Sequence, residues 1–498
     1  MSAFTAWPPD VTTEQLDQLT LLATTWALSH SLIYLPPFTL DKPLPPVPES
    51  AIHAPLSLFP TPVPRQLFKR ALALQRAYNT LYARIALDTA FLDEIMGSGG
   101  VADVDNFSSA LWTAWKQLRD EGVPPPLHLG IFRSDYLLHQ PTSGERITLK
   151  QVEFNTISVS FGCLSQQVAG MHRYLSESTS YFGVSPLLSS ENLPPNDTIN
   201  GLAKGLAEAH RAYGISNAHI LIVVQPDERN VFDQRLLEYQ LFECHGIHVS
   251  RRTFTELGTA ASISPSRALL VAPASPKPNE TSVEISVVYY RTGYAPVDYA
   301  SPADYATRAL LERSRAAQCP SLALQLAGGK KVQEVLTRPG VLERFLAPSE
   351  GAESVRESWV RMWALDEGPD GEGADEAVRR ARELVLKPQR EGGGNNIYRD
   401  KIPQFVAQLP ERERAAWIAM ELIRPPRGVG AHLVRSGAGR VSASVVSELG
   451  VFGWALFVEG REVKEEQAGW LVRTKAEDVD EGGVAAGFGV LDSVVLVD

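Results

Sequence analysis

The hydrophobic pattern predicts helices in the first quarter of the chain. Thr12, with a glutamine three residues further on, has the form of a capping box and predicts the start of a buried helix. Pro64 opens a longer apolar stripe at helical spacing, and we expect this helix to end near Met96, before a glycine-rich loop. Another helix is expected at 111–118, whereas the proline-rich stretch 36–48 indicates an extended connector.

The pattern changes at residue 127, where short apolar runs indicate β-strands. A strand at 127–132 is expected to pair with one at 149–154. Between 218 and 294 strands alternate with helices, which is typical of a small doubly wound α/β unit. In and beside this region we expect strands at 219–224, 247–249, 268–272 and 285–290, and helices at 206–213 and 232–244.

The remainder of the chain mixes the two patterns, so the predicted fold class is mixed α/β. A stretch rich in Gly, Asp and Glu at 367–376 is expected to be an exposed insertion. We expect helices at 303–318 and 330–336, and strands at 383–386, 417–423, 441–449 and 453–458.

Composition narrows the class of protein. The 498 residues are 44% hydrophobic and 21% charged, as in an ordinary globular protein, and the net charge of −11 argues against nucleic acid or an acidic membrane surface as the main partner. Three cysteines without metal-ligand spacing favour a reducing compartment. The N-terminus lacks a signal-peptide pattern, and the apolar stretch 20–35 is too short and too polar to cross a bilayer, so we expect a cytoplasmic protein.

The stretch from Lys387 to Asn396 is the most unusual in the chain. A strand ends in Lys387, and Gly392, Gly393 and Gly394 follow, so that the backbone can fold closely over a ligand with its N–H groups directed inward. Arg390 adds a second cation and Glu391 a possible metal ligand, a combination that suits a nucleotide polyphosphate with Mg²⁺. A surface hairpin with solvated charges is the alternative.

Further polar residues follow the predicted strands. Glu153 and Asn155 share one strand face and offer two hard oxygen donors to Mg²⁺, although a polar sheet edge would have the same pattern. Arg133 and Arg291 each follow a strand directly and could clamp a carboxylate, as could the hydroxyls of Ser158 and Ser160. Surface ion pairs and a serine-rich turn are the alternatives.

Two more groups complete the candidate chemistry. Glu228, Asn230 and Gln234 lie at the head of a helix after strand 219–224, where α/β sheets bind ligands, or they form a solvated helix start. Lys330 and the pair Arg473 and Lys475 are cations beside glycine in an acidic chain, which favours an anionic ligand. Serine-hydrolase and P-loop motifs are absent from the sequence.

Taken in order, these motifs resemble eukaryotic glutathione synthetase over nearly the whole chain. The stretches that carry the resemblance are Arg133-Ser134-Asp135-Tyr136, Glu153 to Gly162, Glu228 to Gln234, Arg291-Thr292-Gly293-Tyr294, Gln325 to Gln333, Lys387 to Tyr398, Ser447 to Gly450, Arg473 to Ala476 and Gly482 to Gly487. The resemblance implies a circularly permuted ATP-grasp fold, a homodimer, and ATP-dependent ligation of γ-glutamylcysteine to glycine through an acyl phosphate. It implies no covalent enzyme intermediate, so catalysis would depend on positioning and electrostatics.

The resemblance also implies an organisation into parts. Residues 1–217 would hold the N-terminal helical region and the first part of the ATP-grasp core, 218–329 a substrate-binding domain, and 330–498 the rest of the core with a glycine-rich lid at about 384–455.

Site residues follow from the resemblance position by position. The Mg²⁺ ligands would be Glu153, Asn155 and Glu391, and the catalytic residues Arg133, Ser160, Lys387 and Arg473. The ATP site would comprise Glu153, Lys330, Lys387, Gln389, Arg390, Glu391, Gly392, Gly393, Gly394, Asn395, Asn396, Tyr398, Met420, Glu421, Leu422, Ile423, Glu448, Lys475 and Glu481. The γ-glutamylcysteine and glycine contacts would be Arg133, Ile157, Ser158, Val159, Ser160, Glu228, Arg229, Asn230, Gln234, Arg291, Thr292, Gly293, Tyr294, Arg473, Val484 and Ala485.

The chain departs from the family pattern at three positions without losing a metal ligand. Leu422 replaces a lysine, Glu481 an aspartate and Thr292 an acidic residue. Two rival functions stay open: a sister ligase that uses a longer amine such as β-alanine, which would need room near Val484 and Ala485, and a non-catalytic nucleotide-binding homologue, for which loss of the metal ligands would be expected.

Overall fold

The structure is a computed structural model of the 498-residue chain. It describes residues 7–37, 48–124, 126–142, 144–274, 281–368, 372–390, 394–461, 463–480, 482–484 and 487–498.

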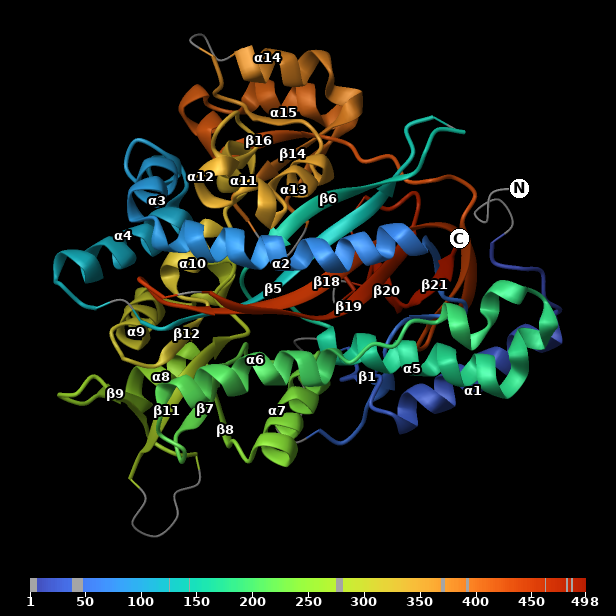
Figure 1. The fold of residues 1–498 in the computed structure, drawn as a ribbon, viewed down its shortest axis with the longest axis horizontal. Helices are drawn as coiled ribbons and strands as arrows, with labels where there is room; N and C mark the ends of the chain where they lie inside the picture. The colour runs from blue at the N-terminus through green and yellow to red at the C-terminus, as the bar shows by residue number, and fades with distance from the viewer. Residues whose placement is uncertain are drawn as a thin grey trace.

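A large twisted sheet runs through the molecule and positions most of the site (Figure 1). Within the described residues it has 13 strands, and its long central strands β5, β18 and β19 pair antiparallel. The strands are β3 (Leu56–Ser57), β5 (His128–His139), β6 (Thr148–Asn155), β7 (His219–Val223), β8 (Val249–Arg252), β9 (Ala261–Ile263), β10 (Leu269–Val271), β11 (Val283–Tyr290), β12 (Ala317–Cys319), β17 (Gly430–Arg435), β18 (Gly439–Phe457), β19 (Lys464–Ala476) and β20 (Gly489–Asp492).

Helices cover both faces of the central strands. The long helix α2 (Arg65–Leu87) crosses one face, and α5 (Gly162–Thr179) and α6 (Thr198–Tyr213) pack on the other (Figure 1). Strand alternation divides β18 between two cores: Val451 and Ala455 join the core with α2, whereas Phe452 and Trp454 join the core with α6. The sheet is therefore buried on both faces along most of its length.

The predicted doubly wound unit is confirmed as one end of this sheet. Strands β8, β7, β11 and β12 run parallel in that order. Helices α6 and α7 (Val231–His245) pack on one face, and α8 (Phe254–Ala260) and α9 (Pro302–Glu312) on the other. Strand β12 also pairs with β5 in parallel, so the unit continues into the central strands.

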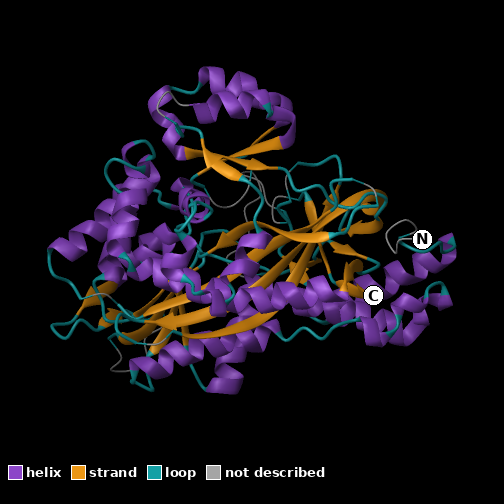
Figure 2. Ribbon diagram, turned by 45° about the horizontal axis from the view of Figure 1, so that its top comes forward, coloured by secondary structure: helices purple, strands orange, loops and turns teal. Residues whose placement is uncertain are grey.

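A second, antiparallel sheet forms a lobe above the large sheet (Figure 2). Its strands are β13 (Met362–Ala364), β14 (Leu384–Pro388), β15 (Ile397–Tyr398) and β16 (Trp417–Glu421). Helices α14 (Glu372–Arg379) and α15 (Ile402–Gln408) cover its outer face, with Trp363, Leu386 and Ala419 in the small core between them. The expected lid at about 384–455 therefore contains strands of two sheets, because β17 and β18 belong to the large one.

The remaining elements flank these sheets. They are α1 (Thr13–Ser29), α3 (Thr89–Met96), α4 (Asn106–Asp120), α10 (Leu322–Ala327), α11 (Lys330–Leu336), α12 (Leu342–Phe345), α13 (Ala352–Ser358), the strand pair β1 (Ile33–Tyr34) and β2 (Ile52–His53), and the strand pair β4 (Thr61–Pro64) and β21 (Val494–Val497).

Several predicted elements are confirmed. The capping box at Thr12 starts α1, and α11 spans the predicted 330–336. The partner strands at 127–132 and 149–154 are β5 and β6. No helix in the described part of the chain is both long enough and apolar enough to cross a membrane.

Other predicted boundaries are wrong for identifiable reasons. The helix from Pro64 stops at Leu87, because the Asp88 side chain accepts a hydrogen bond from Phe91 N and starts α3. The predicted helix 303–318 ends at Glu312, since 317–319 pairs with β5 and β11 as β12. Strands 441–449 and 453–458 form one strand, β18. Helix α14 begins at Glu372, inside the predicted insertion 367–376, and continues past its end to Arg379.

Candidate active site

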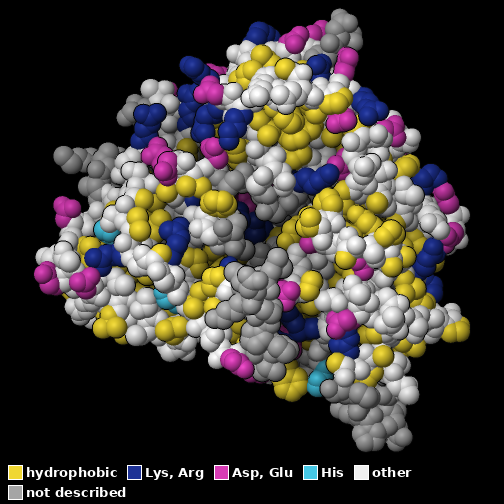
Figure 3. Space-filling view, turned by 180° about the vertical axis from the view of Figure 1, so that it is seen from behind, with side chains coloured by type: hydrophobic (Ala, Val, Ile, Leu, Met, Phe, Trp, Pro, Cys, Tyr) yellow, Lys and Arg dark blue, Asp and Glu magenta, His cyan; other side chains and the backbone are white. Residues whose placement is uncertain are grey.

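A cavity of about 480 Å³ lies between the large sheet and the lobe, and it gathers most of the predicted site residues. In the space-filling view, Lys and Arg side chains are visible inside a hollow near the middle of the molecule (Figure 3). The predicted residues that line it are Arg133, Glu153, Asn155, Ile157, Ser158, Val159, Ser160, Glu228, Asn230, Arg291, Tyr294, Lys330, Lys387, Arg390, Asn395, Asn396, Tyr398, Met420, Glu421, Leu422, Ile423, Glu448, Arg473, Lys475 and Val484.

Strand alternation explains why the polar residues of the large sheet share one face. On β5, Leu129 and Ile131 pack in the core with α6, and Arg133 continues the same face into the cavity. On β19, Leu471 packs in that core and Arg473 continues into the cavity. Arg133 thus lies inside strand β5 rather than after its end, because β5 extends to His139.

Asp135 joins the groups on this face. Its carboxylate is buried and accepts two hydrogen bonds from Arg133, at 2.6 and 2.8 Å. It also accepts one from Arg473 Nη2 and one from Asn155 Nδ2, each at 3.0 Å. One carboxylate therefore holds two guanidinium groups and one amide that line the cavity.

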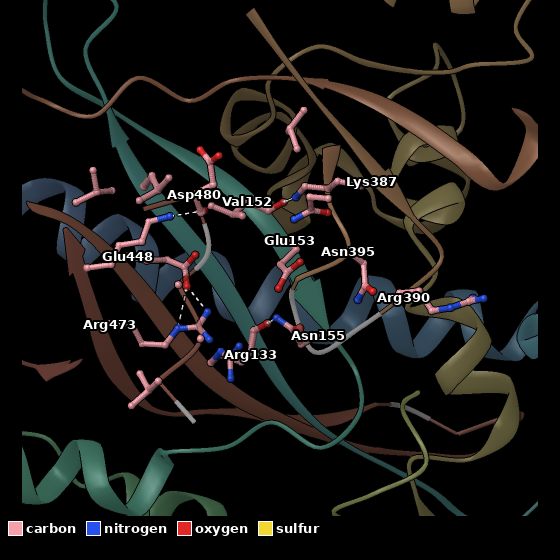
Figure 4. Close-up of a pocket in the computed structure, with 18 of the residues that line it drawn as sticks. Arg133, Val152, Glu153, Asn155, Lys387, Arg390, Asn395, Glu448, Arg473 and Asp480 are labelled. Atoms are coloured by element: carbon pink, nitrogen blue, oxygen red, sulfur yellow. Dashed lines mark hydrogen bonds and ion pairs between the residues drawn. The ribbon is translucent and has the colours of Figure 1, made fainter. Parts of the chain in front are cut away.

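Glu153 lies between cations contributed by separate elements. Its Oε2 is 3.2 Å from Lys330 Nζ, and Lys387 Nζ donates to the carbonyl of the adjacent Val152 at 2.8 Å (Figure 4). Burial by itself raises the pKa of Glu153, but Lys330, Lys387 and Arg473 together hold it below its ordinary value. The carboxylate is therefore ionised at neutral pH, as a metal ligand must be.

Arg473 and Glu448 form a second charged pair at the cavity wall. Arg473 donates to Glu448 Oε1 as well as to Asp135. Burial disfavours the charged form of each partner, and it leaves the pKa of Glu448 above its ordinary value. Burial also acts to lower the pKa of Arg473, but Glu448 and Asp135 raise it above its ordinary value, so the guanidinium keeps its charge.

The loop 157–161 is held in a strained conformation at the other end of the cavity. Ser158 has a φ of 52° and Phe161 of 68°, values that residues other than glycine adopt only when their surroundings impose them. Asp233 of α7 accepts hydrogen bonds from the backbone N–H groups of Phe161 and Cys163, both at 2.9 Å. Arg291 donates to Val159 O at 2.8 Å and lies 3.6 Å from Asp233.

A turn after β11 completes this end. Asp298 accepts hydrogen bonds from the backbone N–H groups of Gly293 and Tyr294, both at 3.0 Å. Gln225, which follows β7 and lines the cavity, donates to Asp298 at 2.7 Å and to the Tyr294 hydroxyl at 3.1 Å. Burial raises the pKa of Tyr294, so its hydroxyl stays protonated as a donor.

The opposite end of the cavity is formed by the lobe. Tyr398 of β15 and residues 420–423 at the end of β16 line it together with Lys387. The Glu421 side chain turns to Arg380, at 2.6 Å, and Leu422 N donates to Glu383 O. This end combines the apolar side chains of Met420, Leu422 and Ile423 with the cation Lys387.

Some predicted residues lie behind the cavity wall. Gln389 accepts from Lys331 N, Arg229 donates to Leu35 O, and Gln234 donates to Glu228, which does line the cavity. Thr292 is buried, and Gly293 and Gly394 also lie outside the lining. Arg390 lines the cavity but pairs with Asp105 in front of α4.

The predicted residues Glu391, Gly392, Gly393, Glu481 and Ala485 lie outside the described residues.

Sequence reasoning missed several site residues. Asp135 belongs to a quoted motif, and its spacing of two from Arg133 on a strand signalled a shared face. Gln225 follows a strand end, which is also a readable signal. Asp480 and Arg399, which line the cavity and pair at 2.8 Å, gave no local signal because they lie 81 residues apart.

Comparisons with known proteins show which sequences and folds this chain is similar to. Residues 13–496 match the family model described as eukaryotic glutathione synthase, ATP binding domain. The chain is 38% identical over 483 residues to glutathione synthetase of Homo sapiens, covering 96% of this chain and 97% of that protein. It is 38% identical over 449 residues to the chloroplastic glutathione synthetase of Arabidopsis thaliana, covering 90% of this chain and 79% of that one. A solved structure of a glutathione synthetase-like effector from Globodera pallida has a TM-score of 0.75 at 24% identity, covers 98% of both chains, and shows the shared fold.

Proposed function

The chain belongs to the eukaryotic glutathione synthetase family, whose fold is of the mixed α/β ATP-grasp type, and we propose on that premise that its cavity ligates γ-glutamylcysteine to glycine with ATP. The protein is an ATP-dependent ligase of glutathione synthesis. In the proposed arrangement the nucleotide binds at the lobe end and the peptide at the end formed by 157–161, Glu228 and Arg291.

The observation that carries the proposal is the ordered row of charges along one cavity wall. Lys387 and Lys330 flank Glu153, and Asp135 then links Asn155 to Arg133 and Arg473. Both the phosphoryl group of the donor and the carboxylate of the acceptor carry negative charge that cations stabilise. In this row the lysines would lie beside the phosphoryl group and the arginines beside the carboxylate.

The donor set fits Mg²⁺. Asn155 Nδ2 is directed at Arg133 O and Asp135 Oδ2, at 3.2 and 3.0 Å, which leaves the amide oxygen as the atom for a cation. With the ionised Glu153 this gives two hard oxygen ligands, and Glu391, outside the described residues, is the proposed third. Bound there, Mg²⁺ would neutralise phosphate charge during transfer.

The chain's own residues would act mainly by holding reactants in line. A carboxylate oxygen of γ-glutamylcysteine attacks the γ-phosphorus of ATP, the bond to ADP breaks, and an acyl phosphate forms. Glycine's amine then attacks the acyl carbon, phosphate leaves, and the amine loses a proton. Lys330 and Lys387 would stabilise charge on the transferred phosphoryl group, and Arg133 and Arg473 would orient the acceptor carboxylate.

Phosphate release tests the function directly. Purified protein is given ATP, Mg²⁺ and γ-glutamylcysteine, with glycine, β-alanine or no acceptor. We expect release that depends on glycine and formation of glutathione. Release that depends on β-alanine instead would identify the sister ligase, and absence of acceptor-dependent release would refute the ligase proposal. Glu391→Gln should abolish turnover, because it removes the negative charge of a proposed metal ligand.

We also propose that the protein is a cytoplasmic homodimer, as its family resemblance implies. Light scattering of the purified protein measures the mass, and a monomer at micromolar concentration would contradict the dimer. A fluorescent fusion measures location, which matters because the matched Arabidopsis thaliana protein is named chloroplastic.

A further inference from the structure

We propose that Asp135 is a positioning residue that couples the metal-binding end of the cavity to its carboxylate-binding end. The inference rests on the proposed ligase function and deepens it. Asp135 is fully buried and is not among the residues that line the cavity, so its carboxylate does not touch a substrate. Any effect of Asp135 on catalysis must therefore act through the side chains that donate hydrogen bonds to it.

The contacts of Asp135 are divided between the two ends. Oδ1 accepts from Arg133 Nε at 2.6 Å, and Oδ2 accepts from Arg133 Nη2, Arg473 Nη2 and Asn155 Nδ2 at 2.8, 3.0 and 3.0 Å. Oδ2 thus accepts three hydrogen bonds and Oδ1 one, from side chains that come from three strands. Arg133 and Arg473 are the proposed contacts of the acceptor carboxylate, whereas Asn155 is a proposed ligand of the cation.

The charge of Asp135 is as important as its shape. The guanidinium groups of Arg133 and Arg473 both donate to Asp135 Oδ2, so two positive charges lie close together. A neutral group at position 135 would leave the repulsion between them uncompensated. Asp135 also raises the pKa of Arg473, after the larger effect of Glu448. Removal of this charge would let both arginines turn toward other acceptors.

The backbone around Asp135 is shaped to admit this carboxylate. Gly450 of β18 pairs with Asp135 across the sheet, and a Cβ there would lie 2.8 Å from Asp135 Oδ1 and 2.9 Å from Arg133 Cδ. The ladder with β6 also changes register directly after Asp135. The glycine thus leaves space for the Asp135 carboxylate, and the irregularity in the ladder changes the direction of side chains beside it.

The test is Asp135→Asn, which keeps the shape and removes the charge. We expect the KM for γ-glutamylcysteine and the half-saturating Mg²⁺ concentration both to rise at least about tenfold, the effect of losing one charge-assisted hydrogen bond, while the KM for ATP at saturating Mg²⁺ is unchanged. The matched control is Ser134→Ala. Ser134 is the buried neighbour of Asp135 on the opposite face of β5, and the variant removes the hydrogen bond that Gln151 donates to its hydroxyl. A purely structural role predicts the same response from both variants, and that result would overturn the proposal.

Gly450→Ala is the second variant, because it displaces the carboxylate without changing any charge. We expect the KM for γ-glutamylcysteine and the half-saturating Mg²⁺ concentration both to rise. If Asp135→Asn does not fold, Gly450→Ala alone tests the positioning role. Unchanged constants in a folded variant would overturn the proposal.

Calorimetric binding of γ-glutamylcysteine with a non-hydrolysable ATP analogue separates this inference from the function. A wild-type protein that binds the peptide without glycine-dependent turnover would refute the proposed function, whereas equal peptide affinity in wild type and Asp135→Asn would refute only the positioning role.

Discussion

Lys330 Nζ lies 3.2 Å from Glu153 Oε2, although 177 residues separate helix α11 from strand β6 along the chain (330 − 153). Lys330 is itself almost fully buried, so the pair faces the cavity in a largely desolvated setting. In such a setting the ammonium both keeps Glu153 ionised and supplies a positive charge for phosphate.

Lys330→Met tests this relationship. We expect turnover to fall by about 100-fold or more, since the variant loses one preorganised cation at the phosphoryl group. The pKa of Glu153 should rise, so the remaining activity should decline at a higher pH on the acid side of the pH–rate profile. Lys331→Met is the matched control, because Lys331 pairs with Asp366 at 3.0 Å and does not line the cavity. Equal losses in both variants would contradict the role given to Lys330.

Asp233→Asn tests the support of the strained loop. Asp233 accepts hydrogen bonds from Phe161 N and Cys163 N and lies beside Arg291, so the variant should raise the KM for γ-glutamylcysteine and lower the free energy of unfolding by about 1–3 kcal/mol. Steady-state kinetics and urea unfolding measure the two effects. Glu243→Gln makes the same charge change at an exposed site on α7 and should alter neither quantity. A KM that stays at the wild-type value would show that the loop needs no such support.

Asp492→Asn tests a buried acid behind the site. Burial raises the pKa of Asp492 from 3.8 to about 7, although hydroxyls of Thr61 and Thr474 donate to it. The folded state thus favours the protonated form. The stabilisation is complete below pH 3.8 and is lost as the pH rises through about 7.

The free energy of unfolding should therefore decline across this window by up to about 1.4 kcal/mol per pH unit for this proton. Urea unfolding at several pH values from 5 to 8 measures the slope, and Asp492→Asn should reduce it. Glu312, whose pKa burial also raises to about 7, adds a slope of the same sign. An identical slope in wild type and Asp492→Asn would refute the assignment to Asp492.

Gly201→Ala tests the packing of α6 on the sheet. An added Cβ would lie 2.3 Å from Ala468 O, a backbone atom that cannot move aside, so we expect a loss of about 1–3 kcal/mol in the free energy of unfolding. Gly258→Ala in α8 is the matched control: its nearest neighbour would be Thr307 Oγ1 at 3.4 Å, and helix propensity favours alanine by up to about 1 kcal/mol. Two equally stable variants would contradict this packing.

Much of the fold was readable from local patterns. The 3.6-residue period marked α2, and the change of period at 127 marked the start of strand β5. Boundaries failed where a distant partner decided the outcome: 317–319 is a strand only because β5 and β11 flank it. Likewise β18 runs unbroken through Gly450 because β5 and β19 pair along both its edges.

The sequence by itself determined the kinds of groups in the site and the strand faces on which they lie. Spacing of two on a strand put Glu153 with Asn155, and the family motifs supplied their order. Only the tertiary structure decided which groups meet: Asp135 with Arg473, Lys330 with Glu153, and Arg390 with Asp105. The physical reason is that local propensity acts over a few residues, whereas these charge pairs form only when strands and helices far apart in the chain pack together and exclude water.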